Sequence, residues 1–190
     1  LGVLSVTSLP LPGAEERGTE GRPLMQIARQ PDFILALVGA LTSYGVMSLL
    51  MTATPLSMVR YQHSFADMAL VIKWHILGMY VPSFFTGYLI RFFGEPRVMM
   101  AGVFVLLTSV LFNLRGTELV HFLVGLALLG LGWNFLFVGA TSLLTTTYKP
   151  REKTKVQAAN DFMVFGLMAL TSFSAGTLEE MVGWRTMNQG

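Results

Sequence analysis

Five long apolar stretches, separated by short polar joints, make up most of the chain. They cover residues 33–57, 68–90, 98–114, 119–145 and 156–178. Because the hydrocarbon core of a bilayer is about 30 Å thick, a helix that crosses it needs roughly 20 apolar residues. A helix of a soluble protein seldom stays apolar on all its faces over such a length. The pattern therefore predicts five membrane-spanning helices.

The two ends of the chain differ from this pattern. Residues 1–9 look like the tail of a hydrophobic segment, and residues 10–31 are rich in proline, glycine and charge, which is typical of a linker. Within that linker residues 24–29 could form a short surface helix, and Asp32 is predicted to be the N-cap of the first span. Residues 181–190 look like the approach to another span. We expect a fragment of a longer polytopic protein; the alternative is a complete five-span protein with a polar tail.

Prolines and glycines punctuate the predicted spans. Pro55 lies near the end of the first span and Pro82 lies inside the second, and each is expected to kink or end its helix. Gly130, Gly132 and Gly139 lie in the fourth span. Small residues let helix backbones approach closely in lipid, so this span is expected to pack tightly against its neighbours.

Composition supports the membrane interpretation and excludes several function classes. The 190 residues are 53% hydrophobic and 13% charged, and that charged fraction is about half the usual value for a soluble domain. A net charge of +2 gives no basic excess that would indicate nucleic-acid binding. There is no cysteine, and the histidines at 63, 75 and 121 are scattered, so no metal site is expected. No phosphate-binding loop, zinc-protease motif or nucleophile elbow occurs, so we expect neither an enzyme nor a bound cofactor.

The basic residues predict an orientation. Cytoplasmic loops of membrane proteins carry an excess of lysine and arginine. Nine of the 13 basic residues fall on one side of the predicted spans: Arg17, Arg22, Arg29, Arg91, Arg97, Lys149, Arg151, Lys153 and Lys155. The N-terminal linker and the joints around 91–97 and 146–155 are therefore predicted to be cytoplasmic.

The joint after the second span carries a recognisable motif. It reads Gly87-x-x-x-Arg91-x-x-Gly94-x-x-Arg97 and resembles the loop motif of the major facilitator superfamily, usually Gly-x-x-x-Asp-x-x-Gly-Arg-Arg or Lys. In that family the motif follows the second span and recurs in weaker form after the eighth. Here Arg91 stands in the place of the aspartate and Glu95 in the place of the first basic residue, so the aspartate's charge contact is not implied. Gly94 is expected to allow a tight turn with positive φ.

The resemblance implies a fold and a function. It places the motif after helix eight, residues 1–31 at the end of helix six and in the cytoplasmic linker between two halves, and the five spans at helices seven to eleven, with Gly183-Trp184-Arg185 entering helix twelve. The expected fold is an all-α integral membrane protein, a polytopic bundle that forms one six-helix half. The expected function is secondary active transport by alternating access, in the inner membrane of a bacterium. Its partners would be a small-molecule substrate, a coupling proton or ion, the lipid bilayer and the missing N-terminal half.

Two other classes of protein remain as alternatives. One is a membrane-anchored sensor or enzyme whose soluble domain lies outside this chain. The other is a non-transporting partner protein with a transporter-like fold. The first alternative would lack the loop motif and would not need polar groups on four of the helices. Loss of function on replacing Tyr44 or Asn134 in an uptake assay would argue against the second.

The resemblance puts helices seven, eight, ten and eleven on the substrate cavity, and five residues there are candidates for it. Tyr44 lies near the middle of its span, and His75 could relay protons because its unperturbed pKa lies near neutrality. Trp133, Asn134 and Phe137 combine an amide with aromatic rings, which suits a ring-bearing or amphiphilic solute. The alternative for Asn134 is a hydrogen bond between helices, with aromatic packing around it.

Three further residues are candidates for gating or coupling. Lys73 lies inside the second span, where it could bind an anionic solute or act as a gate charge, or could extend to the interface. Asn160 and Asp161 lie near the start of the last span. A carboxylate in a span is a functional candidate, but one near a helix N-terminus is also stabilised by the helix dipole. Asp161 is thus predicted to be either a cytoplasmic-gate residue or a helix-start charge.

Overall fold

The computed structural model describes residues 21–187, with side chains described through residue 174 and at Met181. The predicted helix tail at 1–9, the first part of the linker and residues 188–190 lie outside the described part. Within the described part all the regular elements are helices: α1 (Leu24–Ala28), α2 (Pro31–Arg60), α3 (Phe65–Tyr80), α4 (Ser83–Phe93), α5 (Glu95–Arg115), α6 (Leu119–Thr146), the 3₁₀ turn η2 (Pro150–Glu152) and α7 (Lys153–Met187).

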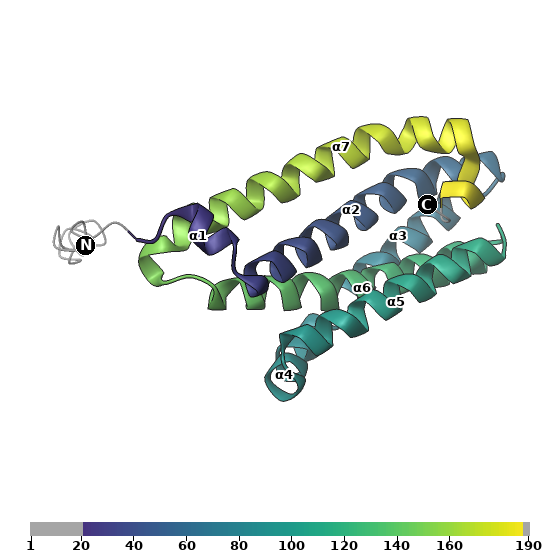
Figure 1. Ribbon diagram of the computed structural model, residues 1–190. Coiled ribbons are helices and arrows are strands. Elements are labelled where there is room, and N and C mark those ends of the chain that lie inside the picture. The colour runs from purple at the N-terminus through teal and green to yellow at the C-terminus, as the bar shows by residue number, and fades with distance from the viewer. Residues whose placement is uncertain (1–20, 188–190) are drawn as a thin grey trace, which may run out of the picture.

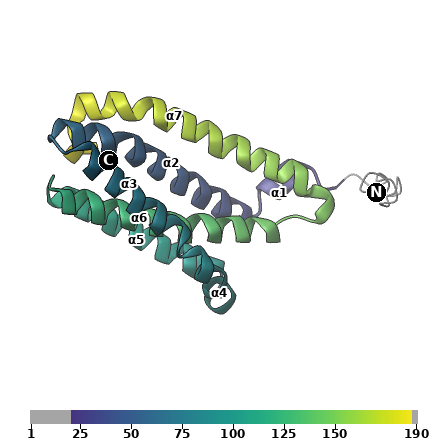
Figure 2. The ribbon, with the colours of Figure 1, turned by 180° about the vertical axis from the view of Figure 1, so that it is seen from behind.

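Helix α6 is the centre of the bundle. Helices α2, α3 and α5 pack on α6, whereas α7 packs mainly on α2, and α4 leaves the bundle at one side (Figures 1 and 2). The glycines of α6 allow this close packing, as predicted. A methyl group on Gly130 would lie 2.4 Å from the carbonyl oxygen of His75 on α3, so only glycine lets the two helices approach this closely.

The helices run up and down the bundle. At one end the turns after α2 and after α5 are joined, because His63 Nε2 lies 2.8 Å from the carbonyl oxygen of Thr117. The other end, called here the α1 end, holds α1, the start of α2 and the α6–α7 turn (Figure 1). Midway along the bundle Ser48 Oγ on α2 lies 2.6 Å from Ser172 Oγ on α7. The alternating directions agree with a polytopic membrane bundle.

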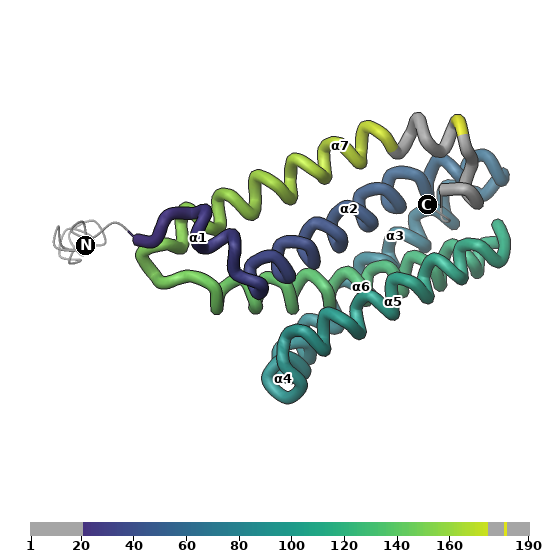
Figure 3. Tube along the Cα trace, viewed as in Figure 1, coloured from purple at the N-terminus to yellow at the C-terminus, as the bar shows by residue number. Residues whose placement is uncertain are grey.

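Four helical segments are long and apolar enough to cross a membrane: Pro31–Arg60, Phe65–Phe93, Glu95–Arg115 and Leu119–Thr146. They coincide with the first four predicted spans. Helix α7 covers the fifth prediction but is not among these four, and only its first part, through residue 174, and Met181 have described side chains. The helix also continues past residue 178 to Met187, where a break was expected. The tube in Figure 3 follows α7 along α2.

Proline has different effects in the two spans where it occurs. Pro82 separates α3 from α4, as predicted, because proline has no amide hydrogen to continue the helix. Pro55 does not end α2, which continues to Arg60. At the start of α2 the N-cap is Gln30 and not Asp32, because Pro31 takes the first helical position and Asp32 falls in the first turn.

The family motif forms the turn between α4 and α5. Gly94 has φ 82° and ψ 157°, a conformation that is open to glycine and closed to other residues, which confirms the predicted positive φ. Glu95 Oε1 accepts a hydrogen bond of 3.1 Å from Ser142 Oγ on α6, and Arg97 donates to the carbonyl oxygen of Phe93 at 3.3 Å. Arg91 is exposed, and Gly87 has open space around it. The motif thus fastens α5 to α6 through the glutamate.

Candidate functional site

Four aromatic rings from three helices form one surface, called here the aromatic wall: Tyr44 on α2, Trp133 and Phe137 on α6, and Phe165 on α7. Trp133 and Phe137 are stacked, with ring centroids 4.8 Å apart and an interplanar angle of 19°. Tyr44 meets both edge-on, at 5.5 Å from Trp133 and 5.0 Å from Phe137. Edge-to-face and offset-stacked rings are the favoured aromatic arrangements, so the wall is a stable set of contacts.

The aromatic wall is open on one side and carries polar groups at its edge. Phe165 is 55% exposed and stands 6.3 Å from Tyr44. The Tyr44 hydroxyl lies within electrostatic reach of Asp161 on α7 and of the Tyr80 hydroxyl at the end of α3. The indole Nε1–H of Trp133 is buried and has no acceptor within the described residues. The wall therefore offers flat rings on its open side, with the Tyr44 hydroxyl and the Asp161 carboxylate near its edge and the Trp133 N–H buried behind it.

Asn160 and Asp161 lie on α7, next to the aromatic wall. The amide Nδ2 of Asn160 donates to Asp161 Oδ1 at 3.2 Å, and Asn160 Oδ1 is buried without a donor among the described residues. Asp161 is exposed, and in this part of the chain its carboxylate contacts the Asn160 amide and not a cation. Both residues lie about two turns inside α7, deeper than the sequence analysis placed them.

Asn134 points away from the aromatic wall, towards the break between α3 and α4. Its Nδ2 donates to the carbonyl oxygen of Met79 at 2.7 Å and to Ser83 Oγ at 2.6 Å. Its Oδ1 accepts from Thr86 Oγ1 at 2.6 Å. The side chain is 1% exposed, so these contacts use its hydrogen-bonding capacity inside the bundle. The geometry matches the helix-joining alternative for Asn134 and leaves it no free group for a solute.

His75 and Lys73 also lie apart from the aromatic wall. His75 is 1% exposed between α3 and α6, and its Nδ1 lies 2.9 Å from the carbonyl oxygen of Leu126. A carbonyl oxygen can only accept, so Nδ1 carries the hydrogen. Lys73 is exposed and lines an apolar groove of about 480 Å³ with Pro55 and Phe65. The structure therefore does not bring either residue together with Tyr44, Trp133 and Phe137.

The sequence analysis missed two aromatic residues at the site. Phe165 completes the aromatic wall, and Tyr80 lies within electrostatic reach of Tyr44. A signal for Phe165 was present, because it follows Asp161 by four residues and so shares a helix face with that candidate. Nothing in the sequence marks Tyr80, because its distance from Tyr44 depends on how the helices are arranged. Among the described residues no group of three or more histidine, aspartate or glutamate side chains could hold a metal ion.

Comparison with known proteins gives consistent matches. The sequence model of the Major Facilitator Superfamily matches residues 36–188. The chain is 45% identical over 168 residues to the riboflavin transporter RfnT of Brucella anthropi, covering 88% of this chain and 42% of that protein. It is also 32% identical over 139 residues to YdeG and 33% identical over 139 residues to YddS, two uncharacterized MFS-type transporters of Bacillus subtilis, with 72% of this chain and 31% of each relative covered. The chain thus spans less than half the length of these relatives. No solved structure matches it significantly.

Proposed function

Because the chain belongs to the major facilitator superfamily, we propose that it forms the C-terminal half of a secondary transporter that carries a small ring-bearing solute. In this proposal α2, α3 with α4, α6 and α7 are the helices that face the cavity, and α5 lies outside. The halves rock around a site near the middle of the bilayer, which opens to each side in turn. The α1 end of the bundle is then the cytoplasmic end, as the basic residues there suggest.

The observation that carries the proposal is the aromatic wall. A flat conjugated solute can stack on the exposed ring of Phe165 and the partly exposed rings of Tyr44 and Phe137. The relative from Brucella anthropi is named for riboflavin, which has a flat three-ring system with a polar chain. The hydroxyl of the partly exposed Tyr44 and the exposed carboxylate of Asp161 beside it suit the polar edge of such a ring. We therefore propose riboflavin or a solute with a similar ring system as the substrate.

We propose a separate role for Asn160 and Asp161 on α7. Asp161 and Asn160 lie beside the aromatic wall on the side towards the α1 end, and Asp161 is charged, exposed and without a cation in the described part of the chain. We assign to Asp161 a contact with a cationic group of the other half or with a coupling proton or ion. Such a contact drives transport only if it differs between the inward-open and outward-open states.

The test is riboflavin counterflow in proteoliposomes that contain the full-length protein. Counterflow requires neither a known direction of transport nor a known coupling ion, so it isolates the solute site. Phe165→Ala removes the exposed ring on which the solute is proposed to stack and is expected to raise the half-saturating riboflavin concentration. An aromatic pair is worth about 0.5–1.5 kcal/mol beyond its buried area, which corresponds to roughly two- to tenfold in affinity.

Phe104→Ala is the matched control. Phe104 is another exposed phenylalanine, 64% against 55% for Phe165, but it lies on α5 and not in the aromatic wall. Its replacement should leave the half-saturating concentration unchanged. Equal effects of the two substitutions, or the absence of any counterflow of riboflavin by the unaltered protein, would contradict the proposed substrate.

A further inference from the structure

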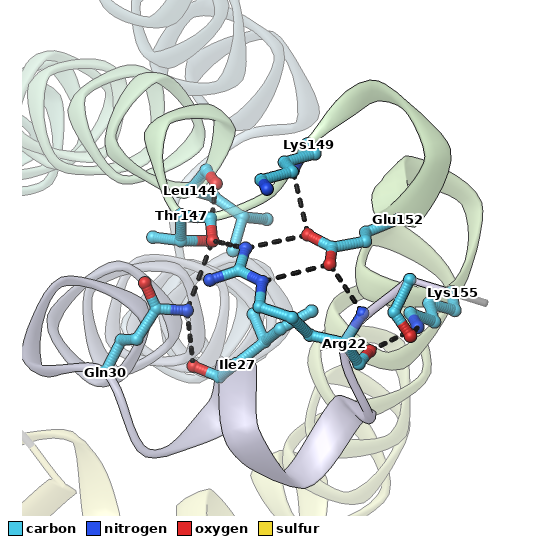
Figure 4. A network of polar contacts seen from close by, with 9 residues as sticks. Arg22, Ile27, Gln30, Leu144, Thr147, Lys149, Glu152 and Lys155 are labelled. Atoms are coloured by element: carbon cyan, nitrogen blue, oxygen red, sulfur yellow. Dashed lines mark hydrogen bonds and ion pairs between the residues drawn. The ribbon is translucent and has the colours of Figure 1, made fainter. Parts of the chain in front are cut away.

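A network of polar contacts at the α1 end joins two segments that are far apart in the sequence (Figure 4). The carboxylate of Glu152, in the turn η2, is 1% exposed. Its Oε1 accepts from the backbone N of Arg22 at 2.8 Å and from Arg22 Nε at 3.0 Å. Its Oε2 accepts from Arg22 Nη2 at 2.7 Å and from the backbone N of Lys149 at 2.9 Å. Four donors thus satisfy both oxygens, and two of them make the fork-shaped pair in which arginine binds carboxylates best.

The same segment is held at further points. Arg22 Nη2 also donates to the carbonyl oxygen of Thr147 at the end of α6, at 3.0 Å, and Gln30 Nε2 donates to that oxygen at 3.2 Å. Lys155 on α7 donates to the carbonyl oxygen of Arg22. Between these contacts Ile27 of α1 is fully buried. Residues 21–30, called here the clasp segment, are therefore fixed along their length against the ends of α2, α6 and α7.

The fit at Gly21 shows how closely the clasp segment approaches the turn. A Cβ atom at this position would lie 2.7 Å from Glu152 Cγ. A side chain on residue 21 would push the segment away from the carboxylate. Glycine thus permits the approach that brings the backbone N of Arg22 to Glu152.

These observations point to a positioning role that the transport mechanism does not by itself require. We propose that Arg22 and Glu152 keep the clasp segment closed on the α6–α7 turn throughout the transport cycle, so that residues 21–30 move with this half and are not part of the linker between the halves. All the contacts join parts of the same half, so rocking of the halves does not need to break them. The clasp segment then holds the start of α7, and with it Asp161 and Phe165, in place relative to α2 and α6. The inference rests on the proposed function only in taking the residues before 21 as the linker between two halves.

The decisive experiment replaces the ion pair by a covalent bond. Disulfides form between neighbouring Cβ atoms, and Gly21→Cys with Glu152→Cys is the natural pair because a Cβ atom on residue 21 would lie 2.7 Å from Glu152 Cγ, the atom next to its Cβ. This chain has no cysteine of its own, and any in the rest of the full-length protein would be removed. Copper phenanthroline serves as the oxidant, and disulfide formation is measured by blocking of alkylation in membranes, without any transport assay. We expect the disulfide to form in most molecules, with and without riboflavin.

Counterflow then distinguishes a clasp segment that stays closed during transport from one that has to open. We expect Glu152→Gln and reduced Gly21→Cys/Glu152→Cys to transport severalfold more slowly than the unaltered protein, and oxidation of the double variant to restore the rate. Asp32→Asn, an acid-to-amide change at an exposed carboxylate in the first turn of α2, should have no such effect.

Failure of the disulfide to form would overturn the docking of the clasp segment. Transport that stops on oxidation and returns on reduction would show that the clasp segment has to open during the cycle, which contradicts the proposal. If the unaltered protein moves no solute, disulfide formation alone still decides whether the segment is docked.

Discussion

At the scale of single residues, burial decides which polar side chains remain free for a solute. His75 and Asn134 lie on membrane-spanning helices and combine polar groups with aromatic neighbours in sequence, as binding residues do. Both are 1% exposed and form their hydrogen bonds with neighbouring helices. A buried polar group needs a partner, and here the backbone of another helix supplies it. Tyr44, Phe137 and Phe165 remain as the candidate contacts, with Trp133 packed behind them.

Replacing His75 tests this distinction. Because the His75 ring joins α3 to α6, His75→Gln should lower the stability of the full-length protein by about 1–3 kcal/mol, the usual cost of disturbing a buried hydrogen bond. The pH dependence of transport should stay the same. Thermal unfolding in detergent measures the first effect and counterflow across pH the second. A titration step that disappears in the variant would show that His75 does relay protons.

The two glycines of the loop motif should respond in opposite ways to alanine. Gly94→Ala places a side chain at φ 82°, which costs about 1–3 kcal/mol of stability. Gly87 lies in the exposed interior of α4 with no atom near its missing side chain, so Gly87→Ala should be neutral or stabilise the helix by about 0.5–1 kcal/mol. Unfolding of the two variants side by side checks the contrast. Similar losses in both would mean that the turn between α4 and α5 differs from the one described.

At the scale of elements, the break between α3 and α4 is the feature that hydropathy alone does not show. Residues 68–90 look like one apolar span, yet α3 ends at Tyr80 and α4 begins at Ser83. Pro82 removes a backbone hydrogen bond, and Asn134 supplies bonds to both sides of the break. α4 has few neighbours within the described bundle and carries large exposed rings, among them Phe84, Tyr88 and Phe92. The amide of Asn134 is therefore the main polar link between α6 and the break.

Loss of that amide should loosen α4. Asn134→Leu keeps the size of the side chain and removes three hydrogen bonds, at about 1 kcal/mol each. Hydrogen–deuterium exchange is expected to speed up over residues 79–93 and to stay unchanged in α5. Thr141→Val, an exposed substitution on the same helix α6, is the control. Unaltered exchange around the break in Asn134→Leu would show that Pro82 and lipid contacts alone define it.

At the scale of the whole molecule, helix α6 connects the aromatic wall to the clasp segment. Helix α6 carries most of the packing, and its two ends meet the α5–α6 turn and the clasp segment. The aromatic wall lies where α2, α6 and α7 meet, with the exposed ring of Phe165 at its open side. In the proposed transporter a second half would cover this side.

The clasp segment should be insensitive to pH in the physiological range. The hydrogen bonds from Arg22 and Lys149 lower the pKa of Glu152 from its ordinary value of 4.5 to about 2. A lowered pKa means that the carboxylate adds stability above the unfolded value and loses it as the pH falls through the folded one. The stability difference between the unaltered protein and Glu152→Gln should thus be constant from pH 8 to about 5 and shrink between pH 4.5 and 2. A difference that changes between pH 6 and 8 would contradict this assignment.

The sequence by itself determined the class of fold and the family. The length and apolarity of the spans predict membrane helices because the bilayer sets a minimum length, and the first four coincide with helices that meet this criterion. Local chemistry was also readable: the break at Pro82, the positive φ of Gly94 and the short helix α1 follow from residue types whose backbone preferences are strong. The motif and the span pattern indicated the superfamily, which the comparisons confirm.

Only the tertiary structure decided which polar residues have their hydrogen bonds satisfied inside the bundle and which segments are held against other helices. Hydrogen-bond partners such as Asn134 and Met79, or Arg22 and Glu152, are 55 and 130 residues apart, and a helix pattern says nothing about which helices cross. Composition placed residues 10–31 in a linker with a short surface helix at 24–29, whereas packing buries Ile27 and pairs Arg22 with a buried carboxylate. The packing of α7 on α2 also brings the ring of Phe165 to 6.3 Å from that of Tyr44. Local sequence preferences act over a turn of helix, while a binding surface is made by residues whose distance depends on the whole fold.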